Sequence, residues 1–378
     1  MKIRSLAGVA IAAAVAVSLS ACASGGTSTD AAGISKADAA NATSVEDFGG
    51  FDGLVKAAKA EGQLNVIATP ESWANYGEML SGFTKKYGIK INSANPDGSS
   101  AEEFAAVRAQ KGQTTAPDVL DVGLAVLEAD DNKSLLTPYK VQAWDDIPDE
   151  RKDADGLYAA GYTGVMSIGY DSSAIKKAPT KIDDLLGADY KGKVAIVGDP
   201  TQANQAAAAV YWAAVQKGGS ADDISKGIDF FSDLKKAGNF QAVTPTQATV
   251  ASGETPVVLQ WNYNNTAWGG ENNPNFKTVV LKGTSIGSYY IQAVSADAPH
   301  PAAARLWQEW IHSVDMENVR LRSGALPVEL DALVKSGKVD EKALEAAGGQ
   351  PEDLVEFTSD QATEAGKVLS AKWAAAIS

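Results

Sequence analysis

The chain has 378 residues, of which 45% are hydrophobic and 21% are charged, the composition of a soluble globular protein long enough for about two domains. Its net charge is -14 at pH 7. No cluster of lysine and arginine is present to neutralise phosphates, so the sequence argues against nucleic acid as a partner. The single cysteine, Cys22, lies near the N-terminus, which excludes disulfides, thiolate metal sites and a cysteine nucleophile in the body of the chain.

Residues 1–22 have the pattern of an export signal. A lysine and an arginine give a basic start, and the apolar run 6–19 is too short for a comfortable membrane span. The sequence LSAC that follows resembles the lipobox of bacterial lipoproteins, in which the cysteine becomes the lipid-modified N-terminus; the alternative is a plain secretory signal. By that resemblance Cys22 is the lipid anchor, on the outer face of the cytoplasmic membrane. Residues 23–44 are small and polar without apolar periodicity, and predict a flexible tether.

The rest of the chain alternates short apolar runs with amphipathic stretches. Strands are expected at 64–68, 87–91, 118–123, 164–170, 193–197, 256–261, 277–281 and 288–295. Helices are expected at 76–87, 104–110, 203–217, 221–236 and 302–313. Strands that alternate with helices predict parallel sheets and an α/β fold.

Ligands of α/β sheets bind beyond the carboxyl ends of the strands, and this rule selects particular loops. Ser72, Trp73 and Tyr76 follow the first strand. Trp73 and Tyr76 are three residues apart and share a helix face, so their rings can point the same way. Tyr76 also continues the apolar series of its helix, and a core position is the alternative for it.

Asp199, Thr201 and Gln202 lie between a strand and a long alanine-rich helix. Exposed N–H groups at a helix N-terminus can hold a carboxylate or phosphate oxygen. Ordinary capping of the helix by Asp199 or Thr201 is the alternative interpretation.

The stretch QWNYNNTAW, residues 260–268, combines rings and amides without any charge at the end of an apolar strand. We interpret Trp261 as a ring on which a ligand stacks, and Asn262 and Tyr263 as hydrogen-bonding groups. Trp268 is expected to pack in the core instead.

Catalysis and metal binding have little support in the sequence. GTSIG at 283–287 matches the G-x-S-x-G nucleophile pattern, but a strand follows it where that pattern needs a helix. His300 and His312 lack a paired partner, so no catalytic residue is expected and the chain is not predicted to be an enzyme. No zinc or calcium spacing is present, and no metal or cofactor is predicted.

Tyr289 and Tyr290 leave one metal alternative open, because phenolates are hard oxygen ligands suited to ferric iron. Adjacent side chains of a strand point to opposite faces. Both tyrosines could bind one ion only if the strand is broken there.

Several stretches, in this order, resemble the periplasmic-type solute-binding proteins of ABC importers. The branch concerned contains spermidine/putrescine-, ferric-iron-, thiamine- and aminophosphonate-binding members. The stretches are ESWANYGEMLSGFTKKYGIKI, PDVLDVG, YTGVMSIGYDSSAIKKAPTKIDDLLGADYKGKVAIVGDP, VASGETPVVLQWNY and QAVSADAPHPAAARLWQEWI.

The resemblance implies a two-lobe, type 2-like periplasmic-binding-protein fold with a hinged cleft between the lobes. Lobe 1 would comprise residues 45–163 and 287–378, and lobe 2 residues 164–286. It further implies a monomer that captures a small-molecule solute and delivers it to an ABC permease in the membrane, without chemistry.

By the same resemblance, Trp73 and Tyr76 match the aromatic pair of the first loop, and Trp261 matches the tryptophan of the returning strand. In polyamine-binding members these rings flank the ligand, and acidic residues grip its ammonium groups.

The acidic residues are mostly replaced here. Gln202 and Tyr290 stand where two of them would be, and Asp199 matches the remaining one. Because one carboxylate compensates a buried polyamine poorly, the sequence favours a neutral, zwitterionic or oxyanionic solute, aminophosphonate-like, over a polyamine. A ferric-iron-binding protein and a secreted enzyme on the same frame are the alternatives.

Overall fold

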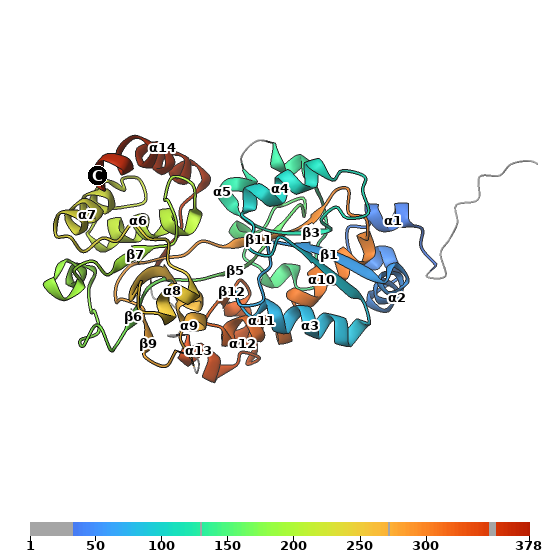
Figure 1. The fold of residues 1–378 in the computed structure, drawn as a ribbon. Helices are drawn as coiled ribbons and strands as arrows, with labels where there is room; N and C mark the ends of the chain where they lie inside the picture. The colour runs from blue at the N-terminus through green and yellow to red at the C-terminus, as the bar shows by residue number, and fades with distance from the viewer. Residues whose placement is uncertain (1–32, 129–130, 271–272, 348–352) are drawn as a thin grey trace, which may run out of the picture.

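The computed structural model describes residues 33–128, 131–270, 273–347 and 353–378. The predicted signal, Cys22 and the first part of the predicted tether lie outside these residues. Within them, the chain forms two lobes of helix and sheet that lie side by side (Figure 1). This agrees with the two-lobe α/β fold expected from the sequence.

Lobe 1 is built on a sheet with one strand near its middle that returns from lobe 2. The strands of this lobe are β1 (Gln63–Ile67), β2 (Lys90–Ala94), β3 (Val119–Gly123), β4 (Leu136–Thr137), β5 (Ala159–Thr163), β11 (Tyr290–Ser295) and β12 (Leu326–Pro327). The sheet order is β12-β5-β11-β3, β4 also pairs with β11, and β1 and β2 form a parallel pair. Every residue of β3, β5 and β11 is buried, so polar side chains on these strands need partners inside the protein.

Lobe 2 has its own sheet. Its strands are β6 (Met166–Asp171), β7 (Val194–Ile196), β8 (Val257–Trp261) and β9 (Phe276–Val279). They lie in the order β7-β8-β6-β9. Between the lobes, β10 (Ser285–Ile286) pairs with β13 (Leu354–Val355).

Helices cover both sheets. They are α1 (Lys36–Asn41), α2 (Phe51–Glu61), α3 (Tyr76–Tyr87), α4 (Ser100–Ala109), α5 (Leu124–Leu127), α6 (Asn204–Gln216), α7 (Ser225–Lys236), α8 (Gln247–Ala251), α9 (Asn262–Trp268), α10 (Pro301–Ile311), α11 (Val314–Arg322), α12 (Leu330–Ser336), α13 (Glu341–Ala346) and α14 (Ser359–Ala376). Local signals explain several ends: Ser99 and Glu102 form a capping box at α4, and Gly88 ends α3 at a φ of 72°. In α6 every residue from Gln205 to Val215 is buried, which accounts for its small alanine side chains.

The expectation of parallel sheets is wrong for much of the structure. β11 runs antiparallel to both β3 and β5, and β6 runs antiparallel to both β8 and β9. The β7–β8 and β1–β2 pairs are parallel. The strands that leave or re-enter a lobe run antiparallel to their neighbours. The alternation of strands and helices along the chain does not reveal this.

The structure also differs from the sequence prediction in the segment assigned to a tether. Residues 36–41 form helix α1, which begins with a Ser35 cap and packs on α10. Arg305 fixes this segment, because its guanidinium donates hydrogen bonds to the carbonyl oxygens of Ala42 at 2.7 Å and Ala40 at 2.8 Å. The folded body therefore begins before residue 45.

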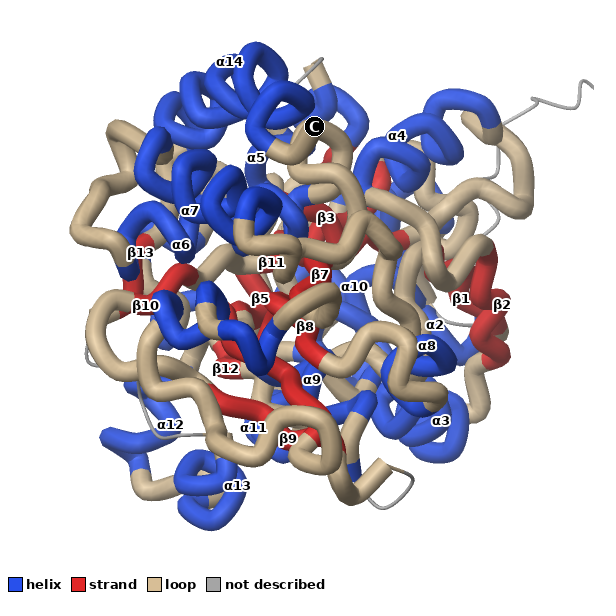
Figure 2. The backbone as a smooth tube through the Cα atoms, turned by 60° about the vertical axis from the view of Figure 1, so that its left-hand side comes forward, coloured by secondary structure: helices blue, strands red, loops and turns tan. Residues whose placement is uncertain are grey.

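The chain passes between the lobes in three places. It leaves lobe 1 through Gly164 and Val165, between β5 and β6, and returns through β10 into β11. After β13 it passes into α14, which packs against α7 in lobe 2 (Figures 1 and 2). The lobe boundaries expected from the sequence remain a proposal, and α14 is an element of 287–378 that lies on lobe 2.

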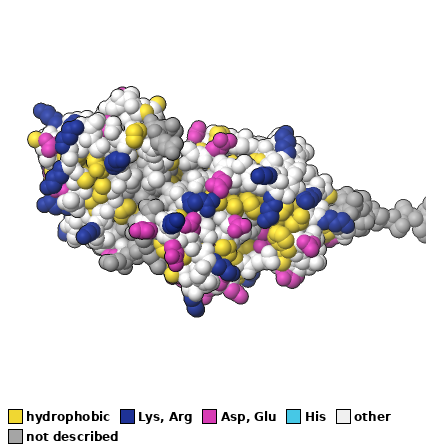
Figure 3. Space-filling view, turned by 90° about the horizontal axis from the view of Figure 1, so that it is seen from below, with side chains coloured by type: hydrophobic (Ala, Val, Ile, Leu, Met, Phe, Trp, Pro, Cys, Tyr) yellow, Lys and Arg dark blue, Asp and Glu magenta, His cyan; other side chains and the backbone are white. Residues whose placement is uncertain are grey.

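The face seen in Figure 3 carries acidic and basic side chains interspersed with small apolar patches. None of the helices in the described part of the chain combines the length and apolarity that a membrane span needs.

Candidate functional site

Aromatic rings from both lobes meet between the two sheets. Trp73 lies in the loop after β1; its ring centre is 5.9 Å from that of Tyr263, in the first turn of α9. It is 5.4 Å from the ring centre of Tyr290, the first residue of β11, at an interplanar angle of 83°. We call the aromatic cluster the set Trp73, Tyr76, Tyr162, Trp261, Tyr263 and Tyr290. The structure therefore brings together predicted site residues from three distant parts of the sequence.

The loop that carries Trp73 has an unusual backbone. Ala68, Ala74 and Asn75 have φ angles of 52°, 44° and 60°, in the left-handed region that residues other than glycine seldom adopt. The Asn75 side chain donates a hydrogen bond to the Val319 carbonyl oxygen at 2.8 Å, which ties the loop to α11. Such strain persists only where surrounding contacts enforce it, and it is common at binding sites.

Asp121, in β3, anchors one side of the aromatic cluster. The hydroxyls of Tyr76 and Tyr162 donate to its Oδ2 at 2.7 Å and 3.0 Å, and Gln292 Nε2 donates to its Oδ1 at 2.8 Å. Burial raises the pKa of Asp121 to about 6, and the Tyr76 hydrogen bond and the nearby Arg320 limit the rise. The carboxylate is thus already occupied, and the Tyr76 hydroxyl is committed to it.

Three polar groups of the aromatic cluster are incompletely paired, although the Trp73 indole lies near Tyr263 and the Trp261 indole near Tyr290. The indole Nε1 atoms of Trp73 and Trp261 and the hydroxyl of Tyr263 are buried and make no hydrogen bond of ordinary geometry to the described residues. Burial raises the pKa of Tyr263 well above its ordinary value, although the nearby Trp73 indole offsets part of the rise. A buried polar group without a partner costs about 1–3 kcal/mol. These three uncharged groups are therefore suited to a ligand that supplies acceptors.

The Asn262 side chain, which is expected from the sequence to bind a ligand, makes its hydrogen bonds within the protein. Its Oδ1 accepts a hydrogen bond from the Val165 N–H at 3.1 Å, and its Nδ2 donates to the Gly324 carbonyl oxygen at 3.0 Å. One end of the amide thus holds the crossing segment against α9, and the other end holds the turn between α11 and β12. Asn262 positions its neighbours Trp261 and Tyr263.

The loop before α6 is organised by its own hydrogen bonds. Asp199 Oδ1 accepts from the Thr201 N–H at 2.8 Å and from the Thr201 hydroxyl at 2.7 Å, and Gln202 Nε2 lies 3.3 Å from that hydroxyl. Asp199, Gln202 and Ser72 are exposed, and Thr201 is half-buried. The structure does not bring these residues into the aromatic cluster. Asn204, at the start of α6, approaches Tyr290 instead.

Tyr289 points away from the aromatic cluster. Its ring lies under the Arg151 guanidinium, 4.3 Å from the ring centre, and it lines a cavity of about 400 Å³ that Tyr290 does not line. Neighbouring side chains thus follow the alternation of an extended chain. The pair does not offer both phenol groups to one ion.

The residues considered for catalysis do not form a catalytic pair. His300 Nδ1 is 2.8 Å from Asp118 Oδ2 inside lobe 1. Ser285 lies in β10, and no hydrogen bond joins it to a histidine among the described residues. A nucleophile–base pair is therefore not seen there.

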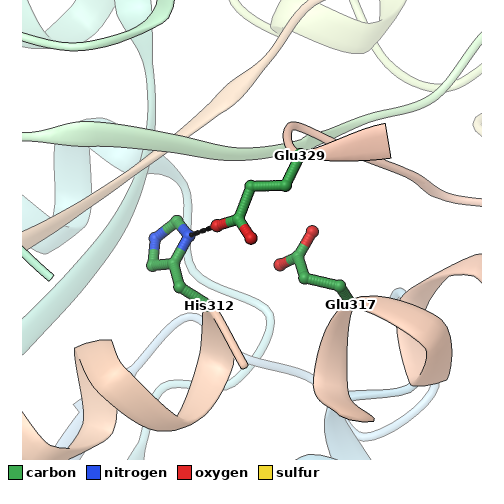
Figure 4. Close-up of side chains that lie close together, drawn as sticks. All are labelled: His312, Glu317 and Glu329. Carbon is green, nitrogen blue, oxygen red and sulfur yellow. Dashed lines mark hydrogen bonds and ion pairs between the residues drawn. The ribbon is translucent and has the colours of Figure 1, made fainter. Parts of the chain in front are cut away.

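A second cluster of buried side chains has its ligand atoms close enough together to hold a cation. His312, Glu317 and Glu329 offer ligand atoms that lie within 4.8 Å of one another (Figure 4). However, Arg320 donates to Glu317 Oε1 at 2.9 Å, so a guanidinium would stand beside any bound metal ion. Burial raises the pKa of Glu317 and of Glu329 to about 8 and lowers the pKa of His312 to about 4. These shifts favour the uncharged form of each group, and with the guanidinium beside them we assign no metal to the cluster.

The comparison with known families identifies the family of this chain. Residues 115–348 match the model of the bacterial extracellular solute-binding protein family. The chain belongs to this family. Its members are bacterial extracellular solute-binding proteins, so this solute-binding protein is an exported one. No curated protein sequence shows a significant match.

Solved structures agree on the fold of the solute-binding protein. The periplasmic binding protein P5PA has a TM-score of 0.61 and 20% identity, covering 84% of this chain and 100% of its own. The spermidine/putrescine ABC transporter substrate-binding protein PotD from Streptococcus pneumoniae has a TM-score of 0.62 and 16% identity, covering 84% and 99%. The ferric binding protein from Campylobacter jejuni has a TM-score of 0.60 and 16% identity, covering 83% and 99%. At these identities the similarity supports the fold and not the ligand.

Proposed function

We propose that the chain is the monomeric, lipid-anchored substrate-binding protein of an ABC importer, which captures a small polar solute at the aromatic cluster and delivers it to a membrane permease. The observation that carries the proposal is the contact of Trp73 from lobe 1 with Tyr263 from lobe 2, beside Tyr290 of the crossing strand. A solute that separates these rings contacts both lobes at once. Its binding energy then favours closure of the lobes around it.

The polar groups favour a neutral, zwitterionic or oxyanionic solute, aminophosphonate-like. The two indole N–H donors and the Tyr263 hydroxyl, which make no hydrogen bond of ordinary geometry to the described residues, complement oxygen acceptors on a ligand. Asp121 is occupied by two tyrosines and a glutamine. A polyamine would need several buried carboxylates to compensate its charges.

Native mass spectrometry of the purified protein, followed by calorimetric titration with any co-purified compound, tests this function. Trp261→Ala is expected to weaken solute binding by about 1–3 kcal/mol, that is roughly 5–150-fold in Kd. Trp268→Ala is the matched control, because Trp268 packs against a separate small core of lobe 2. Equal losses in both variants, or turnover of the solute to a product, would contradict the proposal.

A further inference from the structure

A cavity of about 400 Å³ lies on the opposite side of the crossing strand from the aromatic cluster. Tyr289 lines it, whereas the next residue, Tyr290, contacts Trp73. Neither Trp73 nor Trp261 contributes to its wall. The cavity is therefore distinct from the site proposed above, and Asn204, which lines the cavity and approaches Tyr290, lies between the two.

The wall of this cavity is mostly apolar and comes from both lobes and from the crossing segments. Representative residues are Leu124, Tyr158, Ala208, Tyr211, Tyr289 and Phe357. Tyr211 of α6 stacks on Phe357, with ring centres 4.3 Å apart and an interplanar angle of 18°. A volume of this size, lined by rings and aliphatic chains with a few polar groups, is typical of small-molecule sites.

One end of the cavity is charged and incompletely paired. The Arg151 guanidinium forms an ion pair with Glu356 Oε2 and stacks over Tyr289. The other carboxylate oxygen, Glu356 Oε1, is buried and has no hydrogen-bond partner among the described residues. Glu150, which is exposed, also lines the cavity and lies near Tyr289, so the charged groups beside Tyr289 are two carboxylates and one guanidinium.

These features indicate the chemistry of an occupant. A hydrogen bond from an ionised donor to a carboxylate oxygen is stronger than one between neutral groups. An N–H donor at Glu356 Oε1 would remove the cost of leaving this buried oxygen unpaired. A positive charge would also balance the excess of carboxylates at this end, while an apolar body would cover the rings and aliphatic chains of the wall.

We propose that this cavity is a second small-molecule site, which takes a compound with an apolar body and one cationic amine, the amine bonded to Glu356 Oε1. Because the wall belongs to both lobes, a molecule bound here contacts both of them. Its occupancy favours the arrangement of the lobes described above.

Calorimetric titration with two probes of similar shape and opposite charge tests the site. 2-Phenylethylamine is expected to bind saturably, and 3-phenylpropionate at least about tenfold more weakly. Glu356→Gln should weaken the amine at least about fivefold, since the amide that replaces the carboxylate carries no charge. Glu364→Gln, on the exposed side of α14 with 68% of its side chain accessible, is the matched control and should leave amine binding unchanged.

Two further variants separate this site from the aromatic cluster. Ala208→Phe places a ring in the cavity and should abolish amine binding, with circular dichroism and a thermal melt to confirm folding. Trp261→Ala should leave the amine unaffected. The inference is overturned if the amine shows no saturation below about 10 mM, if both probes bind equally, or if neither Glu356→Gln nor Ala208→Phe changes binding.

Discussion

Replacement of Glu317 by glutamine should change how the stability of the protein depends on pH. Glu317 is fully buried, accepts a hydrogen bond from Arg320 at 2.9 Å and lies close to Glu329 and His312. Burial, followed by repulsion from Glu329, raises its pKa from 4.5 to about 8. Between these values the folded protein keeps a proton that the unfolded chain has lost. The free energy of unfolding therefore falls as the pH rises, and this decline ends above the folded pKa.

The size of the effect follows from proton linkage. One carboxyl group that is protonated only in the folded state changes the free energy of unfolding by at most about 1.4 kcal/mol per pH unit. His312 contributes with the opposite sign, because its pKa is lowered from 6.5 to about 4; its contribution lies below pH 6.5. The window from pH 6.5 to 8 thus isolates the carboxyl groups, and Glu317→Gln should remove up to roughly 2 kcal/mol of decline across it.

Urea unfolding at several pH values in this window measures the effect directly. The wild-type protein should lose stability toward pH 8, and Glu317→Gln should give a flatter line. Glu364→Gln, which changes an exposed carboxyl, serves as the control and should run parallel to the wild type. If Glu317→Gln also runs parallel to the wild type, Glu317 is not protonated in the folded protein and the reasoning fails.

Three further changes have defined outcomes. Asp121→Ala should cost at least about 3 kcal/mol of stability, because it leaves buried donors of Tyr76 and Tyr162 unpaired; Asp121→Asn should cost less in the same urea titration, and equal losses would contradict this role. Asn262→Ala should cost about 2 kcal/mol and weaken solute binding indirectly, since it removes one hydrogen bond to the crossing segment and one to Gly324; an unchanged urea midpoint would contradict this structural role. Cys22→Ser should move the protein from the membrane to the soluble fraction with solute affinity unchanged, and continued sedimentation with membranes would refute the lipid anchor.

The sequence predicts most elements of the fold because their apolar patterns are strong. The series from Tyr76 to Tyr87 gives helix α3 within its observed bounds, and the uncharged run before Asn262 gives β8. Helix α1 escapes prediction because its short, polar and alanine-rich sequence is helical only through its cap at Ser35 and its packing on α10. Tertiary contacts decide such segments.

The site is predicted in part. The rings of Trp73, Tyr263 and Tyr290 are expected near a ligand from their positions in the sequence, and the structure brings them together. Asp121 is not predicted as their partner, since a carboxylate within an apolar strand gives no local sign of what it accepts. The same holds for Arg151 and Glu356, because charged residues from distant loops meet only once both lobes are folded.

The ring contacts between the lobes have a consequence for selectivity under the proposed function. In the arrangement described here the aromatic cluster is already packed, so an incoming solute has to replace contacts between Trp73 and its neighbours. The apparent affinity then equals the intrinsic affinity multiplied by the fraction of molecules in which this packing is open. The protein's own side chains act as an internal competitor, which sets a threshold that weakly interacting solutes fail to cross.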